Sequence, residues 1–147
     1  MSQENVEIVR RHIEHRGGVT PEDAREYVDE FWDSEGDYYP VRKFPEARPC
    51  HGREEIARFH AELMDAWDEL EFAIKRLIAV GDDRVVVHAL MQAEGRGSGL
   101  KLEGDLYQCV WIRHGRFFRW EDHLTLEGAI RALGLSGETL EDAGLSE

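Results

Sequence analysis

Apolar residues follow two different spacings along the chain, and each spacing predicts a different kind of element. In the first half they recur every three or four residues, which is the spacing of a helix with one buried face. The glycine pair Gly17-Gly18 separates the first two such segments, and Pro21 favours a helix start directly after Thr20. The predicted helices are Ser2–His15, Pro21–Trp32 and Gly52–Asp68.

The second half alternates apolar and polar residues with a period of two, which predicts strands that are buried on one side. Short glycine-containing connections separate these strands and are typical of antiparallel hairpins, so a meander is the simplest topology. Helices that precede a run of hairpins indicate an α+β fold. The predicted strands are Asp37–Val41, Leu70–Val80, Arg84–Glu94, Lys101–Arg113 and Arg116–Leu124, and a last helix runs from Thr125 to Gly134.

One acidic residue lies on the apolar face of the last predicted strand. The alternation there places Asp122 on the same side as Phe118 and Trp120. Burying an ionised carboxylate is costly, so such a group is expected to have a hydrogen-bond partner, a raised pKa, or both. Catalytic acids and bases are often built in this way. Asp122 is therefore the first candidate for a catalytic residue.

Length and charge limit the classes of function. The 147 residues can form one domain with a sizeable core, and no repeat or linker divides them. The 31 acidic and 18 basic residues give a formal net charge of −13, which disfavours nucleic acids and anionic membrane surfaces as partners. We expect a single domain over residues 1–147, with residues 136–147 as a loosely held polar tail.

The cysteines and the apolar runs indicate in which compartment the protein is expected and which kinds of site it lacks. Cys50 and Cys109 are too few for a disulfide framework, and no paired Cys/His spacing indicates zinc. No apolar stretch approaches the ~20 residues of a membrane span. We expect a cytoplasmic protein that has no membrane partner and uses neither a metal nor a cofactor.

Three sequence stretches resemble a known family. They are SQENVEIVRR at residues 2–11, HGREE at residues 51–55 and GRF at residues 115–117. With the order of elements, they resemble the SnoaL-like branch of the nuclear transport factor 2-like superfamily, over nearly the whole chain. The resemblance implies a cone-shaped α+β barrel, in which a curved antiparallel sheet wraps around a long helix and encloses a mostly apolar pocket. It also implies a homodimer.

Laying the predicted strands on this cone gives a candidate ligand pocket. On Lys101–Arg113 we expect the even-numbered residues to face inward. On Arg84–Glu94 the expected inward residues are Val86, His88, Leu90 and Gln92. A few polar groups then converge within apolar walls, as in many small-molecule sites, so the expected ligand is an apolar or aromatic small molecule. The expected lining residues are His12, Phe31, Tyr39, Phe59, Leu63, Trp67, His88, Leu90, Gln92, Leu106, Gln108, Val110, Phe118, Trp120 and Asp122.

The resemblance also suggests a chemistry for Asp122. Polyketide cyclases of the SnoaL type keep their acid or base carboxylate at this position, which implies cofactor-free proton transfer on a carbonyl-containing substrate, with His88 as the partner of Asp122. Ketosteroid isomerases of the superfamily need carboxylates where this chain has Tyr39 and Gln108, and a tyrosine where it has His12. Steroid isomerisation is therefore disfavoured.

Two interpretations of the aromatic lining remain open. The lining encloses a ligand pocket, or its side chains fill the cone as core while His88 and Asp122 satisfy each other. In the second case the protein is a non-catalytic ligand-binding or interaction module. The odd-numbered residues Tyr107, Cys109 and Trp111 are then of most interest, because their apolar centre between charged ends is typical of a dimer face.

Overall fold

The computed structural model describes residues 2–16, 20–41, 47–67 and 70–134, so the expectation for residues 136–147 lies outside the described residues. The predicted helices and strands are all present, and β1 begins at Trp32 rather than at Asp37. The elements in chain order are α1 (Ser2–Arg16), the short 3-10 helix η1 (Pro21–Asp23), α2 (Ala24–Phe31), β1 (Trp32–Tyr39), β2 (Cys50–His51), α3 (Gly52–Ala66), β3 (Glu71–Val80), β4 (Arg84–Glu94), β5 (Lys101–Arg113), β6 (Arg116–His123) and α4 (Leu126–Leu133).

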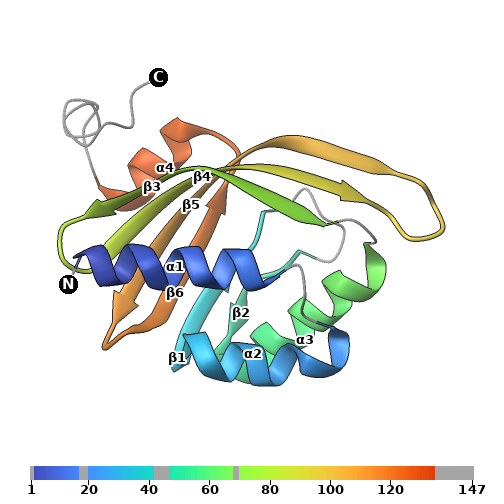
Figure 1. Ribbon diagram of the computed structural model, residues 1–147, viewed down its shortest axis with the longest axis horizontal. Helices are drawn as coiled ribbons and strands as arrows, with labels where there is room; N and C mark the ends of the chain where they lie inside the picture. Colours follow the sequence, from blue (N-terminus) through green and yellow to red (C-terminus); the bar gives the residue numbers. More distant parts are fainter. Residues whose placement is uncertain (1, 17–19, 42–46, 68–69, 135–147) are drawn as a thin grey trace.

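The strands form one curved sheet with the order β2-β1-β6-β5-β4-β3 (Figure 1). Strands β3 to β6 make the predicted antiparallel meander. The sheet is nevertheless mixed rather than purely antiparallel, because β1 lies parallel to β6. The sheet is not closed, since β2 and β3 form its two edges. The predicted α+β fold is therefore confirmed, with a parallel pair that the hairpin pattern did not predict.

Helices cover the two faces of the sheet unequally. The main core lies between the inner face and the helices α1, α2 and α3, and it contains side chains such as Val9, Val28 and Ile56. A smaller cluster lies on the outer face, where Ala129 and Leu133 of α4 pack against β4 and β5 (Figure 1). In the described part of the chain, no helix has the length and apolar character needed to cross a membrane.

The face of β4 that points inward is the opposite of the one predicted. Val85, Val87 and Ala89 belong to the main core, whereas Val86 packs under α4 on the outer face. Three consecutive valines at 0% exposure show that both sides of this part of β4 are covered. A period-two pattern carries no information about direction in such a strand. His88, Leu90 and Gln92 alternate with the core residues and therefore do not line the interior.

An irregularity in β6 changes which of its aromatic residues point inward. Trp111 pairs with Arg119 but the next residue, Ile112, pairs with Phe117, so Phe118 is the extra residue of a β-bulge. Phe117 is consequently in the main core. Phe118 lies outside it, with the Arg113 guanidinium 4.7 Å from its ring centroid. The prediction that Phe118 lines the interior is wrong, while Trp120 and Asp122 keep their predicted direction beyond the bulge.

Helix α4 covers much of the surface that the sequence suggested as a dimer face. Tyr107 and Cys109 are buried in the cluster under α4, and the Cys109 thiol donates a hydrogen bond to the carbonyl oxygen of Ala129. Trp111 is only partly buried at the edge of this cluster. The apolar centre of the odd-numbered face therefore packs against the chain's own last helix.

Gly36 is required by a close approach inside β1. The pairing of β1 with β6 shifts register between Trp32 and Asp37, and in this stretch the Trp32 ring lies against Gly36. A Cβ atom on Gly36 would lie 2.6 Å from Cε3 of Trp32 and 3.2 Å from the carbonyl oxygen of Phe117. Trp32 is itself buried and has no free direction in which to move.

We therefore expect Gly36→Ala to destabilise the fold by about 1–3 kcal/mol through overpacking. This loss corresponds to a melting temperature lowered by roughly 2–4 °C for each kcal/mol, measurable by thermal and urea unfolding. Ser34→Ala, at an exposed position of the same strand, is the matched control and should change stability by less than about 0.5 kcal/mol. Equal stability of the two variants would contradict the close contact.

Candidate functional site

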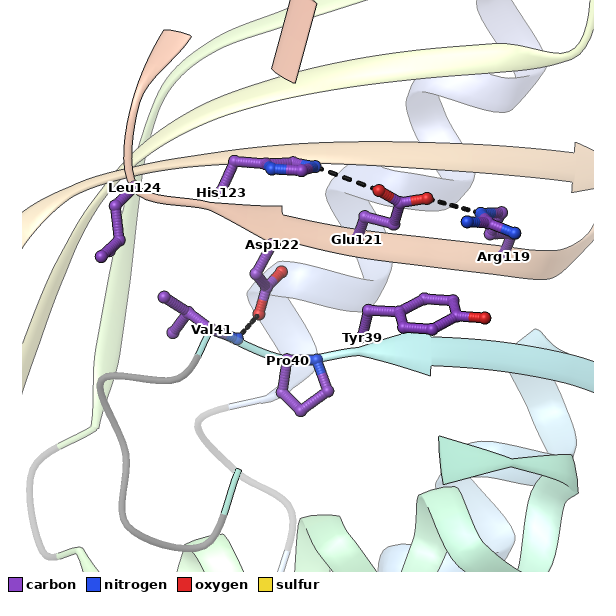
Figure 2. A pocket seen from close by; sticks show the side chains of 8 residues that line it. All are labelled: Tyr39, Pro40, Val41, Arg119, Glu121, Asp122, His123 and Leu124. Atoms are coloured by element: carbon purple, nitrogen blue, oxygen red, sulfur yellow. Dashed lines mark hydrogen bonds and ion pairs between the residues drawn. The ribbon is translucent and has the colours of Figure 1, made fainter. Parts of the chain in front are cut away.

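Asp122 lies where the pairing of β1 and β6 ends. The last paired residues of the two strands are Tyr39 and Glu121, and Pro40 has no N–H group with which to continue the ladder. The next N–H group, that of Val41, donates instead to Oδ2 of Asp122 at 3.2 Å. Figure 2 shows the Asp122 carboxylate turned toward this main-chain nitrogen, while Glu121 and His123 point to the other side of β6.

Each oxygen atom of Asp122 accepts at least two hydrogen bonds. Oδ1 accepts from Nε2 of Gln108 at 2.8 Å and from Nε1 of Trp120 at 3.0 Å. Oδ2 accepts from the Tyr38 hydroxyl and from the Val41 N–H group, both at 3.2 Å. Donors of this kind stabilise the ionised carboxylate. Asp122 therefore points inward and is hydrogen-bonded, as the sequence predicted. The bonds to Oδ1 are shorter than those to Oδ2.

The partners of Asp122 are only partly those that the sequence indicated. Gln108 points inward as predicted, and Trp120 supplies a donor as well as an apolar wall. Tyr38 faces inward in place of Tyr39, because β1 begins at Trp32 and includes a register shift. Two adjacent tyrosines give no signal as to which of them points inward, so sequence reasoning missed Tyr38.

A surface pocket of about 390 Å³ opens beside Asp122, at the ends of β1 and β6 (Figure 2). Asp122 is half-buried and forms part of its wall. One side of the pocket carries apolar groups from the chain after β1 and from Leu124, and the other carries polar side chains of β6. The lining residues are Tyr39, Pro40, Val41, Arg119, Glu121, Asp122, His123 and Leu124.

A row of charged side chains lies along the outer face of β6 beside this pocket. Nε of Arg119 donates to Oε2 of Glu121 at 2.6 Å. The other oxygen of Glu121, Oε1, lies 3.2 Å from Nε2 of His123. The sequence placed Arg119, Glu121 and His123 on the polar face of the strand, but it gave no sign that they border a pocket.

The interior of the cone is occupied by side chains. Seven of the fifteen predicted lining residues are at most 4% exposed and belong to the main core rather than to an open cavity. The pockets of about 390, 260 and 230 Å³ all lie at the surface, and the predicted lining residues that they include are Tyr39, Gln92 and Asp122. This outcome matches the interpretation in which aromatic side chains fill the cone. The core residues concerned are Phe31, Phe59, Leu63, Trp67, Leu106, Val110 and Trp120.

Two buried histidines pack against the aromatic donors of Asp122. The ring of His12 lies 5.0 Å from the Trp120 ring, measured between centroids. The ring of His60 stacks on Tyr38 at 5.9 Å. His12, expected in the pocket wall, is thus part of the core, and His60 joins it from α3. The carboxylate is therefore connected through aromatic rings to both α1 and α3.

His88 does not contact Asp122, because it lies on the outer face of the sheet. Its ring stacks on Tyr107 at 4.4 Å, and its Nε2 lies 2.9 Å from Oδ1 of Asp105. The pKa of Asp105 is lowered mainly by its hydrogen bond from Lys75, and also by its hydrogen bond with His88. The predicted pairing of His88 with Asp122 is therefore wrong.

The other predicted polar group of β4 is also outside the interior. Gln92 is exposed and donates to Glu103 at 3.0 Å. Leu90, on the same side of β4, is half-buried and lies outside the main core.

No cluster of three or more His, Cys, Asp or Glu side chains able to hold a metal ion occurs within residues 2–16, 20–41, 47–67 and 70–134.

Solved structures of other proteins share this fold. A hypothetical protein with a ketosteroid isomerase-like fold from Catenulispora acidiphila DSM 44928, in complex with trimethylamine, aligns with a TM-score of 0.69 and 17% identity, over 90% of this chain and 95% of that chain. A putative SnoaL-like polyketide cyclase from Jannaschia sp. CCS1 aligns with a TM-score of 0.68 and 19% identity, over 92% and 94%. TerC, co-crystallised with polyporic acid, aligns with a TM-score of 0.67 and 19% identity, over 88% and 97%.

These identities are low, so the structural likenesses establish the fold alone. The comparison with curated proteins found no match. The family comparison is more specific, because the model described as the SnoaL-like domain matches residues 9–120. The match covers most of the chain, from Val9 within α1 to Trp120 within β6. The protein therefore belongs to the SnoaL-like domain family.

Proposed function

We propose that this protein binds a small carbonyl-containing molecule in the pocket at the ends of β1 and β6, and that Asp122 acts there as a proton acceptor. The observation that carries this proposal is that Asp122, a half-buried acid, lines a pocket of about 390 Å³. That volume lies within the range of roughly 300–1,000 Å³ that is usual for small-molecule sites. The putative polyketide cyclase among the similar structures supports the same class of substrate.

The hydrogen bonds of Asp122 define the kind of proton that it can remove. A carboxylate with four donors is a weak base, so it suits a carbon acid that is already activated by a neighbouring carbonyl group. Oδ2 carries the longer bonds and is the oxygen better able to exchange a partner. In the proposed step it takes the proton, and the electron pair of the C–H bond moves to the carbonyl oxygen as an enolate.

The donors around Asp122 then have separate tasks. Gln108 and Trp120 hold Oδ1 and keep the carboxylate oriented. The Tyr38 hydroxyl bonds to Oδ2 from the core side of the carboxylate, and it is a side-chain donor, whereas the Val41 N–H group is part of the main chain. Tyr38 is therefore proposed to stabilise the enolate oxygen. The reaction is of the cyclase or isomerase type and needs no cofactor for the proton transfer.

A non-catalytic binding protein is the second candidate, and a specific observation favours it. The four hydrogen bonds described above for Asp122 are internal, and they join β1, β5 and β6 as a structural carboxylate would. In that case the pocket binds its ligand without turnover. The two candidates differ only in whether a proton leaves the bound molecule.

A cytoplasmic location and homodimer formation remain proposals. Of the expected dimer face formed by Tyr107, Cys109 and Trp111, α4 covers the first two residues. Trp111 is the remaining part of that face. Light scattering of the purified protein and of Trp111→Glu tests it: a mass of two chains that falls to one in the variant supports the dimer face.

Deuterium exchange into bicyclic ketones tests the proposed chemistry without a known substrate. With 2-tetralone in D₂O, the protein should accelerate the loss of the protons next to the carbonyl group, as followed by NMR. Tyr38→Phe should slow this exchange by about 10-fold or more, because one donor to the enolate is lost. Tyr107→Phe is the control and should retain the rate, because Tyr107 is buried under α4 on the outer face and does not line the pocket. Exchange no faster than in buffer would favour the binding protein.

Asp122→Asn is expected to reduce stability as well as activity. An amide has one acceptor oxygen, so its NH₂ group would face either the Trp120 or the Val41 N–H group, and neither donor can turn away. Leaving a buried donor unsatisfied costs about 1–3 kcal/mol, which urea unfolding would measure. Asp65→Asn at an exposed position should be neutral. Unchanged stability of Asp122→Asn would argue against the four-donor arrangement.

A further inference from the structure

We propose that the pocket recognises a carboxylate group on its ligand, and that Arg119 is the residue that binds it. The proposal rests on the proposed function in placing the ligand in this pocket, but it does not depend on proton transfer at Asp122. It concerns the wall of the pocket on the outer face of β6, where Arg119 lies beside Tyr39 and Glu121 (Figure 2).

The guanidinium group of Arg119 has contacts with three neighbouring side chains. Its Cζ lies 4.8 Å from the ring centroid of Tyr39 on β1 and 5.4 Å from that of Trp111 on β5. Its Nε donates to Glu121 at 2.6 Å. Contacts with two rings and one carboxylate restrict the side chain before any ligand arrives, although it remains 43% exposed. Restricting a side chain in advance lowers the entropic cost of binding.

The terminal nitrogens of Arg119 are available for a ligand. Neither of them makes a hydrogen bond or an ion pair with any residue in the part of the chain that the structure describes. The Nε side of the group is occupied by Glu121, which leaves the end formed by Nη1 and Nη2. Two parallel N–H groups at this end match the two oxygens of a carboxylate, and such bidentate pairs are among the stronger hydrogen bonds in proteins.

The neighbouring acids do not prevent an anion from binding at this end. Glu121 is only 14% exposed, and its two oxygens are engaged by Arg119 and His123. The carboxylate of Asp122 points to the opposite side of β6 and is surrounded by donors. The recognition of an anion here therefore depends on its direct contact with the guanidinium and not on the overall charge of the pocket. More distant surface acids are screened at physiological salt, where the Debye length is about 8 Å.

The remaining walls indicate the shape of the ligand. Pro40, Val41 and Leu124 provide an apolar side, and the Tyr39 ring provides an aromatic surface beside the guanidinium. A planar, apolar body with a carboxylate at one end fits this combination of surfaces. The chemical class that we infer is therefore a small aromatic or alicyclic carboxylate, and any reacting carbonyl group would belong to the same molecule.

Calorimetric titration with 2-naphthoate and with its neutral analogue 2-naphthamide tests the proposal. We expect saturable binding of the naphthoate and binding of the amide that is about 10-fold or more weaker, because the charge-assisted pair is lost. Arg119→Gln should weaken naphthoate binding by a similar factor. Arg119→Lys should also weaken it, because a lysine cannot reproduce the bidentate geometry. Both variants are used only if their melting temperatures match that of the native protein to within about 2 °C, a shift equivalent to roughly 1 kcal/mol or less.

Arg113→Gln is the matched control. Arg113 is also an exposed arginine stacked on an aromatic ring, that of Phe118, but it does not line the pocket. Its replacement should leave naphthoate binding unchanged. Absence of naphthoate binding, equal binding of acid and amide, or equal binding by Arg119→Gln and the native protein would overturn the proposal. A change of molecular mass in Arg119→Gln without any effect on naphthoate would also overturn it, since the wall would then be an interface between copies.

The binding and exchange experiments distinguish failure of the carboxylate site from failure of the catalytic role. Naphthoate binding that depends on Arg119, together with no exchange of ketone protons, would leave the carboxylate site standing and remove the catalytic role. Catalysed exchange that neither naphthoate nor Arg119→Gln affects would retain the catalytic role and remove the carboxylate site.

Discussion

The carboxylate of Asp122 joins three strands at the point where the sheet stops being a continuous ladder. Strands β1 and β6 are parallel, so no hairpin connects them, and Pro40 ends their hydrogen bonding. The four donors to Asp122 come from β1, from the residue after Pro40, from β5 and from β6 itself. One charged group therefore replaces the backbone pairing that this corner of the fold lacks.

The same group also connects the sheet to the helices. Trp120 and Tyr38 each donate to the carboxylate and each pack against a buried histidine, His12 of α1 and His60 of α3. The interior is thus an aromatic core in which the Asp122 carboxylate is hydrogen-bonded to aromatic side chains that pack against buried histidines. This packing explains why the cone is filled and why the space for a ligand lies at the end of β1 and β6. The site proposed there depends on the same residues that close the core.

Much of the fold follows from the sequence because most of its elements bury only one face. The alternation in β5 correctly places Leu106, Gln108 and Val110 inward, and Asp122 keeps its predicted direction in β6. The inward face of β4 is not predictable in this way, because α4 covers its outer side and makes both faces apolar. The bulge at Phe118 and the register shift in β1 arise from strand pairing, which a local pattern does not contain. The pocket beside Arg119 depends on those same pairings.

The most direct test of the central role of Asp122 is hydrogen exchange at the main-chain amide of Val41, followed by NMR. This amide lies beyond the last residue of β1, and its hydrogen bond is to Oδ2 of Asp122. It should exchange slowly in the native protein and much faster in Asp122→Asn, while the amide of Ile112, which donates to Asp83, stays protected in both. Exchange of the Val41 amide at the rate of an unstructured peptide, or equal protection in both proteins, would contradict the account.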